Sequence, residues 1–292
     1  MKISCFLIIG LTFISCTGTK KAVTVTETTS TAPKTEILDS VPTSTTEVIK
    51  ITDALYVPDS KEEIEIIDEP LLKQETHINA FNHQTFDSLL QKHVSKHGNV
   101  DYKGIKSNWS ALRNYMSELN KNKPKEDWSK NQKLAYWINA YNAMTIDLIL
   151  RHYPVKSIKD IKNPWKKRYW ELSEKWYNLN EIEHQILRKM DEPRIHFVII
   201  CASYSCPKLQ NRAFTAFNLE TQLTKATKEF LSDPERNLIS ENSLQLSKIF
   251  QWFGKDFKQN GSLIDFLNQY SEVQISNKAE INFKDYNWDL NE

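Results

Sequence analysis

Hydrophobic positions recur at helical spacing through the first part of the aromatic-rich region of this chain. The spacing predicts an amphipathic helix over 81–97, ended by Gly98, and a second helix over 105–119. Residues 133–152 form the longest such stretch, and they are apolar almost all round. A helix without a polar face is expected at the centre of a domain.

Different periodicities follow in the second half. The segment 170–179 suggests a small hairpin, and Asn180 caps a predicted helix through Met190, with Glu183 at capping-box spacing. The short apolar run at 195–201 indicates a strand buried on both faces. Further elements are expected as helices near 219–232 and 262–270 and as a strand pair near 237–246. We therefore predict an α+β fold, a helix-rich single domain around a small central sheet, spanning 76–292.

The N-terminus carries a different pattern. Cys5 to Ile14 is an apolar run too short to span a bilayer, which needs about 20 residues. It suits a signal peptide over 1–15. The run ends in Phe13-Ile14-Ser15-Cys16, which resembles a lipoprotein cleavage box, although Phe13 departs from the usual Leu. Cys16 would then carry fatty acyl chains such as palmitate and anchor the chain to a membrane. The alternative is an ordinary secreted protein cut nearby.

Residues 16–75 are expected to form a flexible tether behind that anchor. From Thr17 to Lys50 the chain is rich in Thr, Ser and Val and has no aromatic residue, so it cannot bury enough apolar area to offset its ordering entropy. Thr17 stands where an inner-membrane retention signal would place Asp. By resemblance to such lipoproteins, we expect the outer membrane, with the domain facing the periplasm.

Composition and the absence of certain motifs argue against several classes of function. Lys plus Arg is 38 and Asp plus Glu is 37, which argues against a nucleic-acid partner, although 165–170 is a short basic run. Only 6 glycines occur, and none has the spacing of a dinucleotide or P-loop motif. Neither G-x-S-x-G nor H-E-x-x-H occurs. No cofactor is predicted.

Several motifs appear in a characteristic order along the chain. They are Gly98-Asn99-Val100-Asp101-Tyr102, Tyr136 to Ala143, Tyr153-Pro154-Val155, Ile182-Glu183-His184-x-x-Leu187-Arg188, Arg194-Ile195-His196-Phe197, Cys201-Ala202-Ser203-x-Ser205-Cys206-Pro207, Ile249 to Phe257 and Tyr286 to Asn291. Together they resemble the domain-of-unknown-function family 547 over roughly 81–292. The resemblance implies a domain often found in exported bacterial proteins. It implies no activity and no catalytic residues.

The two cysteines of the domain leave three alternatives. Cys201 and Cys206 form a disulfide, or Cys201 is a catalytic thiol, or both are inert buried thiols. If 195–201 is a strand, alternation places His196 on the face opposite Cys201. His184 is then the better base, with Asn139 or Asn142 orienting it from the central helix.

Four further residues are binding candidates, and three of them have a plainer explanation. They are Asn142, Glu183, Arg188 and Ser203. A buried amide usually satisfies backbone groups, Glu183 suits a helix cap, and Arg188 pairs readily with a carboxylate. His93 and His97 lack an evident third ligand, so no metal is predicted.

Two function classes stay open, and whether the chain is an enzyme is undecided. The favoured class is a membrane-anchored envelope lipoprotein that binds an unidentified envelope partner or small ligand. The alternative is a cysteine-dependent amide hydrolase or acyl transferase that uses Cys201 with His184.

Overall fold

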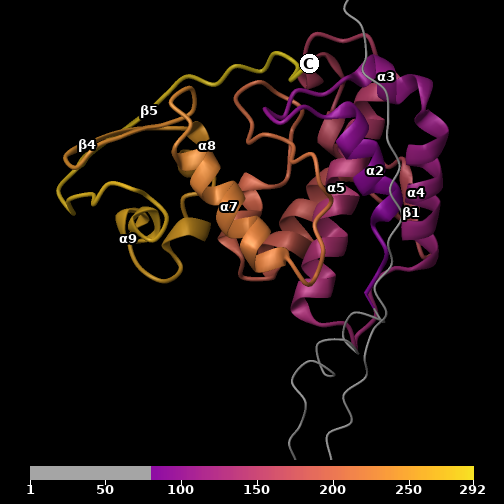
Figure 1. Cartoon of the computed structure of the whole chain (residues 1–292), viewed down its shortest axis with the longest axis horizontal. Helices are drawn as coiled ribbons and strands as arrows, with labels where there is room; N and C mark the ends of the chain where they lie inside the picture. Colours follow the sequence, from indigo (N-terminus) through magenta and orange to yellow (C-terminus); the bar gives the residue numbers. More distant parts are fainter. Residues whose placement is uncertain (1–79) are drawn as a thin grey trace, which may run out of the picture. The chain divides into compact units, whose positions relative to one another are not determined.

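The computed structural model describes residues 80–292, which form a helix-rich α+β fold with two small sheets (Figure 1). This confirms the predicted fold class. The predicted signal peptide, Cys16 and the tether over 16–75 lie outside the described residues. Among residues 80–292, no helix has both the length and the apolar composition that crossing a bilayer requires.

Helix α5 (Lys130–His152) is the centre of the larger hydrophobic cluster. Ser129 and Gln132 form a capping box at its start, and seventeen consecutive residues from Leu134 to Leu150 are buried. The near-absence of a polar face explains this burial, because every side of the helix must be covered by another element. The prediction of a central helix is confirmed.

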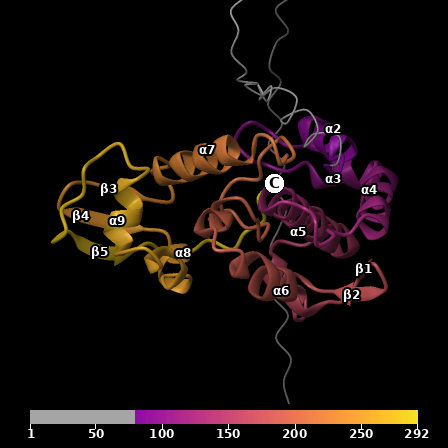
Figure 2. The ribbon, with the colours of Figure 1, turned by 90° about the horizontal axis from the view of Figure 1, so that it is seen from below.

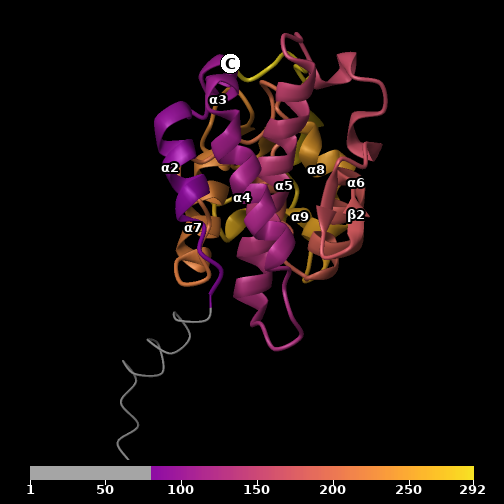
Figure 3. The same ribbon diagram turned by 90° about the vertical axis from the view of Figure 1, so that its right-hand side faces the viewer.

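Helices α3 (Tyr102–Ser107) and α4 (Trp109–Lys121) pack against α5, and α2 (Gln84–His93) packs on both of them (Figures 2 and 3). The predicted first helix ends earlier than expected, because the chain after His93 turns so that Val94 pairs with Val100. Gly98 therefore lies in this turn, at φ +85°, and not at a helix end. The predicted helix over 105–119 is divided at Asn108 into α3 and α4.

Asp147, a fully buried carboxylate on α5, ties the neighbouring elements to that helix. It accepts hydrogen bonds of 2.8 Å from the indoles of Trp109 and Trp170 and pairs with Arg151 at 2.6 Å. Trp170 begins the antiparallel hairpin of β1 (Trp170–Leu172) and β2 (Lys175–Tyr177), which confirms the predicted hairpin. A buried charge is tolerated here because every side of it is hydrogen-bonded.

The helix predicted from Asn180 is irregular. One α-helical turn, α6 (Leu179–Glu181), leads into a π-helical turn, η3 (Ile182–Ile186), and then a 3-10 turn, η4 (Leu187–Lys189). Asn178 is the N-cap, so the predicted capping box of Asn180 with Glu183 is wrong. π-Helical turns are rare and frequently occur at functional sites.

The strand predicted over 195–201 is also wrong. Residues Pro193–Phe197 form a 3-10 helix, η5, and the chain then continues without regular structure to Cys201. The residues are buried, as predicted, but the backbone groups of Val198 and Ile200 bond to the side chain of Asn142 and not to a neighbouring strand. A short apolar run does not distinguish a buried strand from another buried conformation.

A second hydrophobic cluster is built from the C-terminal elements, drawn in orange to yellow in Figure 2. Strands β3 (Leu238–Ile239) and β4 (Ser243–Leu246) form the predicted pair, which is antiparallel, and β5 (Glu280–Phe283) adds in parallel to β4. The predicted helices are α7 (Leu219–Leu231) and α9 (Leu263–Asn268), while α8 (Lys248–Trp252) was not predicted.

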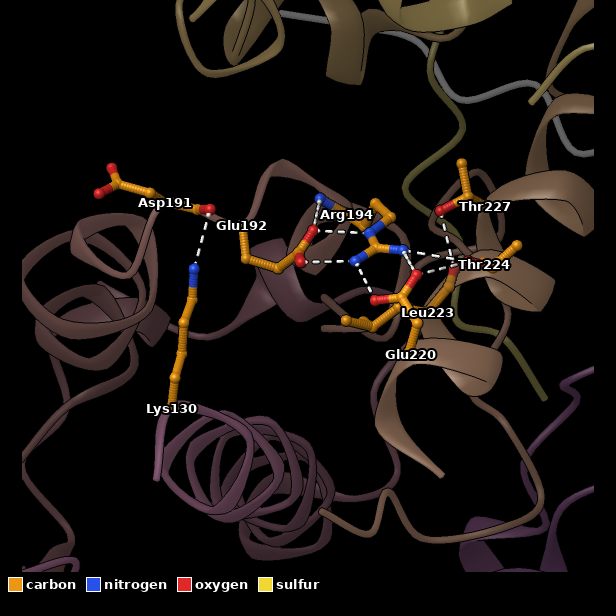
Figure 4. Close-up of polar contacts among 8 residues, drawn as sticks. All are labelled: Lys130, Asp191, Glu192, Arg194, Glu220, Leu223, Thr224 and Thr227. Carbon is orange, nitrogen blue, oxygen red and sulfur yellow. Dashed lines mark hydrogen bonds and ion pairs between the residues drawn. The ribbon is translucent and has the colours of Figure 1, made fainter. Parts of the chain in front are cut away.

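Arg194 fastens the start of η5 to α7 (Figure 4). Its guanidinium bonds both oxygens of Glu192 at 2.7 Å, both oxygens of Glu220 and the hydroxyl of Thr224 at 3.0 Å. Hydrogen bonds to the two carboxylates raise the pKa of Arg194. All donors of this nearly buried side chain are therefore used within the protein, and η5 is held in place two residues before His196.

Candidate active site

A cleft of about 600 Å³ lies beside η3, η5 and α8. It is bordered by the loop 159–166 and by aromatic residues of the C-terminal segment. Residues of both hydrophobic clusters line the cleft. These residues are distant in sequence and meet only in the tertiary structure. Among the chemically active residues that line it are Cys201, Cys206, His184, His196, Glu183 and Tyr286.

Cys201 is a partly buried thiol that forms no disulfide, and its polar neighbours are Ser203, Cys206 and Tyr286. Its sulfur lies 2.9 Å from the hydroxyl of Ser203 and 3.2 Å from that of Tyr286. Hydrogen bonding from the Cys206 thiol, opposed by burial and assisted by Ser203 and Tyr286, lowers the pKa of Cys201 to about 7. The thiolate is the nucleophilic form of cysteine, so this environment favours reactivity at neutral pH.

The neighbours of Cys201 keep their own protons. Burial raises the pKa of Cys206, and burial likewise raises the pKa of Tyr286. Both groups therefore remain hydrogen-bond donors where Cys201 is ionised. The Cys206 sulfur in turn accepts a hydrogen bond of 2.9 Å from the backbone N–H of Cys201. Among the described residues, Cys201 and Cys206 are two free thiols, with no disulfide between them.

A strained backbone follows Cys201. Ala202 has φ +56°, a left-handed conformation that an alanine adopts only at a cost, and such strain gathers at functional sites. The C-terminal segment holds this turn, because Ser203 pairs with Leu290 and the N–H of Asn291 bonds the carbonyl of Ala202 at 3.2 Å. The same segment carries Tyr286 to the sulfur of Cys201.

Two histidines on the cleft are joined by a charged network. His196 Nε2 lies 2.9 Å from Asp256 Oδ2, and Arg188 bonds both oxygens of Asp256, at 2.6 and 2.7 Å. Arg188 also bonds His184 Nδ1 at 2.8 Å. Burial alone would raise the pKa of Asp256, but hydrogen bonds from His196 and Arg188 outweigh it and hold that pKa well below its usual range.

The network assigns different roles to the two histidines. Arg188 can only donate, so His184 Nδ1 accepts, and the proton of the neutral ring lies on Nε2. Asp256 can only accept, so His196 donates from Nε2, and its Nδ1, which has no hydrogen bond within residues 80–292, is the nitrogen that can take a proton. A protonated His196 would face a carboxylate, whereas a protonated His184 would face a guanidinium. His196 is therefore the better base, and His184 suits a hydrogen-bond donor.

This result changes the predicted pairing of Cys201 with His184. Both residues line the cleft, but among residues 80–292 the sulfur of Cys201 has no hydrogen bond to a histidine. Strand alternation does not separate His196 from Cys201, because His196 belongs to a 3-10 helix. His196 lines the same cleft as Cys201 and stacks on Phe253, with ring centroids 4.0 Å apart.

The two asparagines of α5 bind backbone groups. Asn139 bonds the N–H and carbonyl of Phe214 at 3.0 and 2.7 Å, and it does not line the cleft. Asn142 bonds the carbonyl of Val198 and the N–H of Ile200, just before Cys201. Asn139 therefore does not orient a histidine, while Asn142 positions the segment that carries the thiol.

The other candidates have assigned contacts. Glu183, on the π-helical turn, lines the cleft and accepts a hydrogen bond of 3.0 Å from Tyr141. Arg188 is not arranged to grip an anion with two parallel hydrogen bonds, because its guanidinium donates to Asp256 and His184. Ser203 bonds the sulfur of Cys201 and lies 3.0 Å from the hydroxyl of Tyr286.

Asp256 and Tyr286 are the site residues that sequence reasoning missed. Both stand in motifs that carried the family resemblance, and the expected carboxylate partner of Arg188 was a signal for Asp256. Neither lies near Cys201 in sequence, so their roles depend on the tertiary fold. In residues 80–292, no three histidine, cysteine or carboxylate side chains are grouped in a way that would ligate a metal ion.

Comparison with known proteins gives one match. Residues 125–231 match the family model described as "Protein of unknown function, DUF547". This segment contains His184, Arg188, His196 and Cys201, but it ends before Asp256 and Tyr286. No curated protein matches the chain, and no solved structure does. The match over 125–231 supports membership of this chain in the DUF547 family.

Proposed function

We propose that this protein is a thiol-dependent enzyme of acyl transfer, an amide hydrolase or acyl transferase, with Cys201 as nucleophile and His196 as acid and base. One observation carries the proposal. A cysteine whose pKa is lowered to about 7 shares a cleft with a histidine that is hydrogen-bonded to a carboxylate. Such a set of nucleophile, base and orienting group is the usual arrangement for covalent catalysis at a carbonyl.

The reaction follows from these roles. The thiolate of Cys201 attacks the carbonyl carbon of the substrate, and the C–S bond forms as the carbonyl electrons move to oxygen. The carbonyl re-forms as the C–N bond breaks, and His196, which holds on Nδ1 the proton lost by the thiol of Cys201, gives that proton to the leaving amine. Neutral His196 next removes a proton from water or from an acceptor amine, which attacks the thioester and releases the thiolate. Asp256 stabilises His196 whenever it is protonated.

An activated ester tests the proposal, because its leaving group needs no proton. With p-nitrophenyl acetate, we expect acetylation of Cys201, seen as one added acetyl group on the peptide that contains it, followed by turnover. Cys201→Ala should abolish the acetylation. His196→Gln should still be acetylated but should release acetate about 10²–10⁴-fold more slowly, because the attacking water then lacks its base.

His184→Gln is the matched control. Gln keeps an acceptor for Arg188, and His184 is not the base in this scheme, so release of acetate should change much less than in His196→Gln. If instead His184→Gln blocks release and His196→Gln does not, the assignment of the base is wrong. If Cys201 is not acetylated at all, the enzyme proposal fails and ligand binding in the cleft becomes the better explanation.

We also propose the location that the N-terminal sequence indicates: a lipid anchor at Cys16 that holds the domain at the outer membrane, facing the periplasm. The cleavage box before Cys16 and the Thr-rich 16–75 segment support it. Labelling of growing cells with radioactive palmitate should mark the wild-type chain and not Cys16→Ala. Equal labelling of both chains, or none, would refute the anchor.

A further inference from the structure

Three lysines border the mouth of the cleft on one loop. Lys159, Lys162 and Lys166 are exposed and line it. Within residues 80–292, Lys162 and Lys166 make no ion pair or side-chain hydrogen bond, and the ammonium of Lys159 lies 4.7 Å from the ring centre of Trp288. Their charges are therefore not neutralised by carboxylates of the described domain.

The loop that carries these lysines is firmly held. Ser157 and Asp160 cap its first turn, and Asn163 has a left-handed φ of +52° that redirects the chain before Pro164. Ile161 and Pro164 are buried beneath it. The lysine stems thus leave a fixed backbone, so the position of the positive charge along the cleft is defined by the fold.

An aromatic wall lies beside this charge. Trp288 packs edge-on against Trp165, with ring centroids 6.0 Å apart, and stacks against Trp252 at 5.8 Å. Tyr286 packs on Trp288 at 4.6 Å, and the same tyrosine reaches the sulfur of Cys201. Trp252 is 46% exposed, which is a large apolar surface to leave in water. The wall therefore connects the lysines to the thiol.

The charge of the cleft is unbalanced. Glu183 is the carboxylate among the described lining residues, and it accepts a hydrogen bond from Tyr141. Asp256 does not line the cleft and is paired with Arg188. Clefts lined by one sign of charge concentrate ligands of the opposite sign. No arginine lines the described cleft, and arginine is the side chain that grips phosphate with two parallel hydrogen bonds.

From this arrangement we infer that the substrate is an acyl compound bearing a carboxylate, which lies near Lys159, Lys162 and Lys166 while its carbonyl reaches Cys201 along the aromatic wall. The reaction rests on the proposed function. The preference for a negative charge does not, because it is a property of the cleft that a simple alkylation of Cys201 can measure.

Iodoacetate and iodoacetamide form a matched pair of probes, since they deliver nearly the same group and differ in charge. The rate of alkylation at Cys201 is followed for each by mass spectrometry of its peptide, at low and high salt. In Lys162→Gln/Lys166→Gln we expect the ratio of the iodoacetate rate to the iodoacetamide rate to fall about four-fold at low salt, about two-fold for each exposed charge. High salt should remove most of the difference.

Lys167→Gln is the control, because this lysine is adjacent in sequence but does not line the cleft. It should leave the ratio unchanged. An equal ratio in wild type and in the double variant overturns the inference, and so does an equal fall in Lys167→Gln, which would reflect net charge alone. Taking the ratio removes any change in the reactivity of the thiol itself.

A second pair of probes connects the preference to catalysis. Mono-p-nitrophenyl succinate carries a carboxylate, whereas p-nitrophenyl butyrate is neutral and of similar length. The double lysine variant should lose kcat/KM for the succinate and keep it for the butyrate. Failure of both esters to react would refute the proposed function but leave the charge preference to be decided by the alkylation ratio.

Discussion

Tyr286→Phe tests whether the surroundings of Cys201 lower its pKa. The substitution removes one hydroxyl that lies 3.2 Å from the sulfur and keeps the ring that packs on Trp288. The reactivity of the thiol should change because the ionised sulfur loses a donor, while the aromatic wall keeps its shape.

The expected size of the effect follows from the structure. The pKa of Cys201 falls from 9.0 to about 7, which corresponds to about 3 kcal/mol in favour of the thiolate. Hydrogen bonds from Cys206, Ser203 and Tyr286 share this stabilisation against the opposing effect of burial. If Tyr286 supplies about 1 kcal/mol, its loss raises the pKa by somewhat less than one unit, and the alkylation rate at pH 7 falls about two-fold to five-fold.

The assay is the pH dependence of alkylation by iodoacetamide, measured at the peptide that contains Cys201. The midpoint should move to higher pH in Tyr286→Phe, while the rate at high pH, where all of the thiol is ionised, should stay the same. Tyr204→Phe is the control, because that exposed ring packs under Arg236 and does not line the cleft. An unchanged midpoint in Tyr286→Phe would refute the reasoning, and a lower plateau would show that the site had been distorted.

Three further predictions concern residues around the site and in the core. Asn139→Ala and Asn142→Ala should each lower the free energy of unfolding in urea by about 2–4 kcal/mol, because two buried backbone groups lose their partner, but only Asn142→Ala should also change alkylation of Cys201. Asp256→Asn should slow release of acetate from the acetylated enzyme, because an amide can donate to its histidine partner and favour the wrong tautomer; release at the wild-type rate would contradict this. Burial lowers the pKa of His83 from 6.5 to about 3, so only the unfolded chain takes up this proton as pH falls between those values, and stability should fall by up to about 1.4 kcal/mol per pH unit. In His83→Gln this part of the pH dependence should disappear in urea unfolding, and an unchanged slope would contradict the assignment.

The helices with a clear apolar period were predictable from the sequence. Residues 133–152 are apolar almost all round, and a helix of that kind is expected inside a domain, as α5 is. The hairpin at 170–177 and the helix at 219–231 were likewise predictable, because alternation and helical spacing are local properties. The strand predicted over 195–201 failed because the backbone groups of this segment bond to the side chain of Asn142, more than 50 residues away. The cap predicted at Asn180 failed because Asn178, two residues earlier, is the N-cap.

The sequence identified four candidates, Cys201, His184, Arg188 and Ser203, because few residue types perform chemistry of this kind. The residues that each of them contacts could not be predicted. Whether a histidine acts as base depends on what binds its other nitrogen, and that choice is made by contacts across the fold.

Local period and residue type were enough to predict the α+β character, the buried central helix and the candidate thiol. The choice of His196 over His184 as the base came from contacts across the fold, because a carboxylate 60 residues away orients one ring and an arginine orients the other. The tertiary structure also decided which groups surround the sulfur of Cys201. Tyr286 is 85 residues away in sequence and reaches it only because the C-terminal segment packs along the turn after the cysteine.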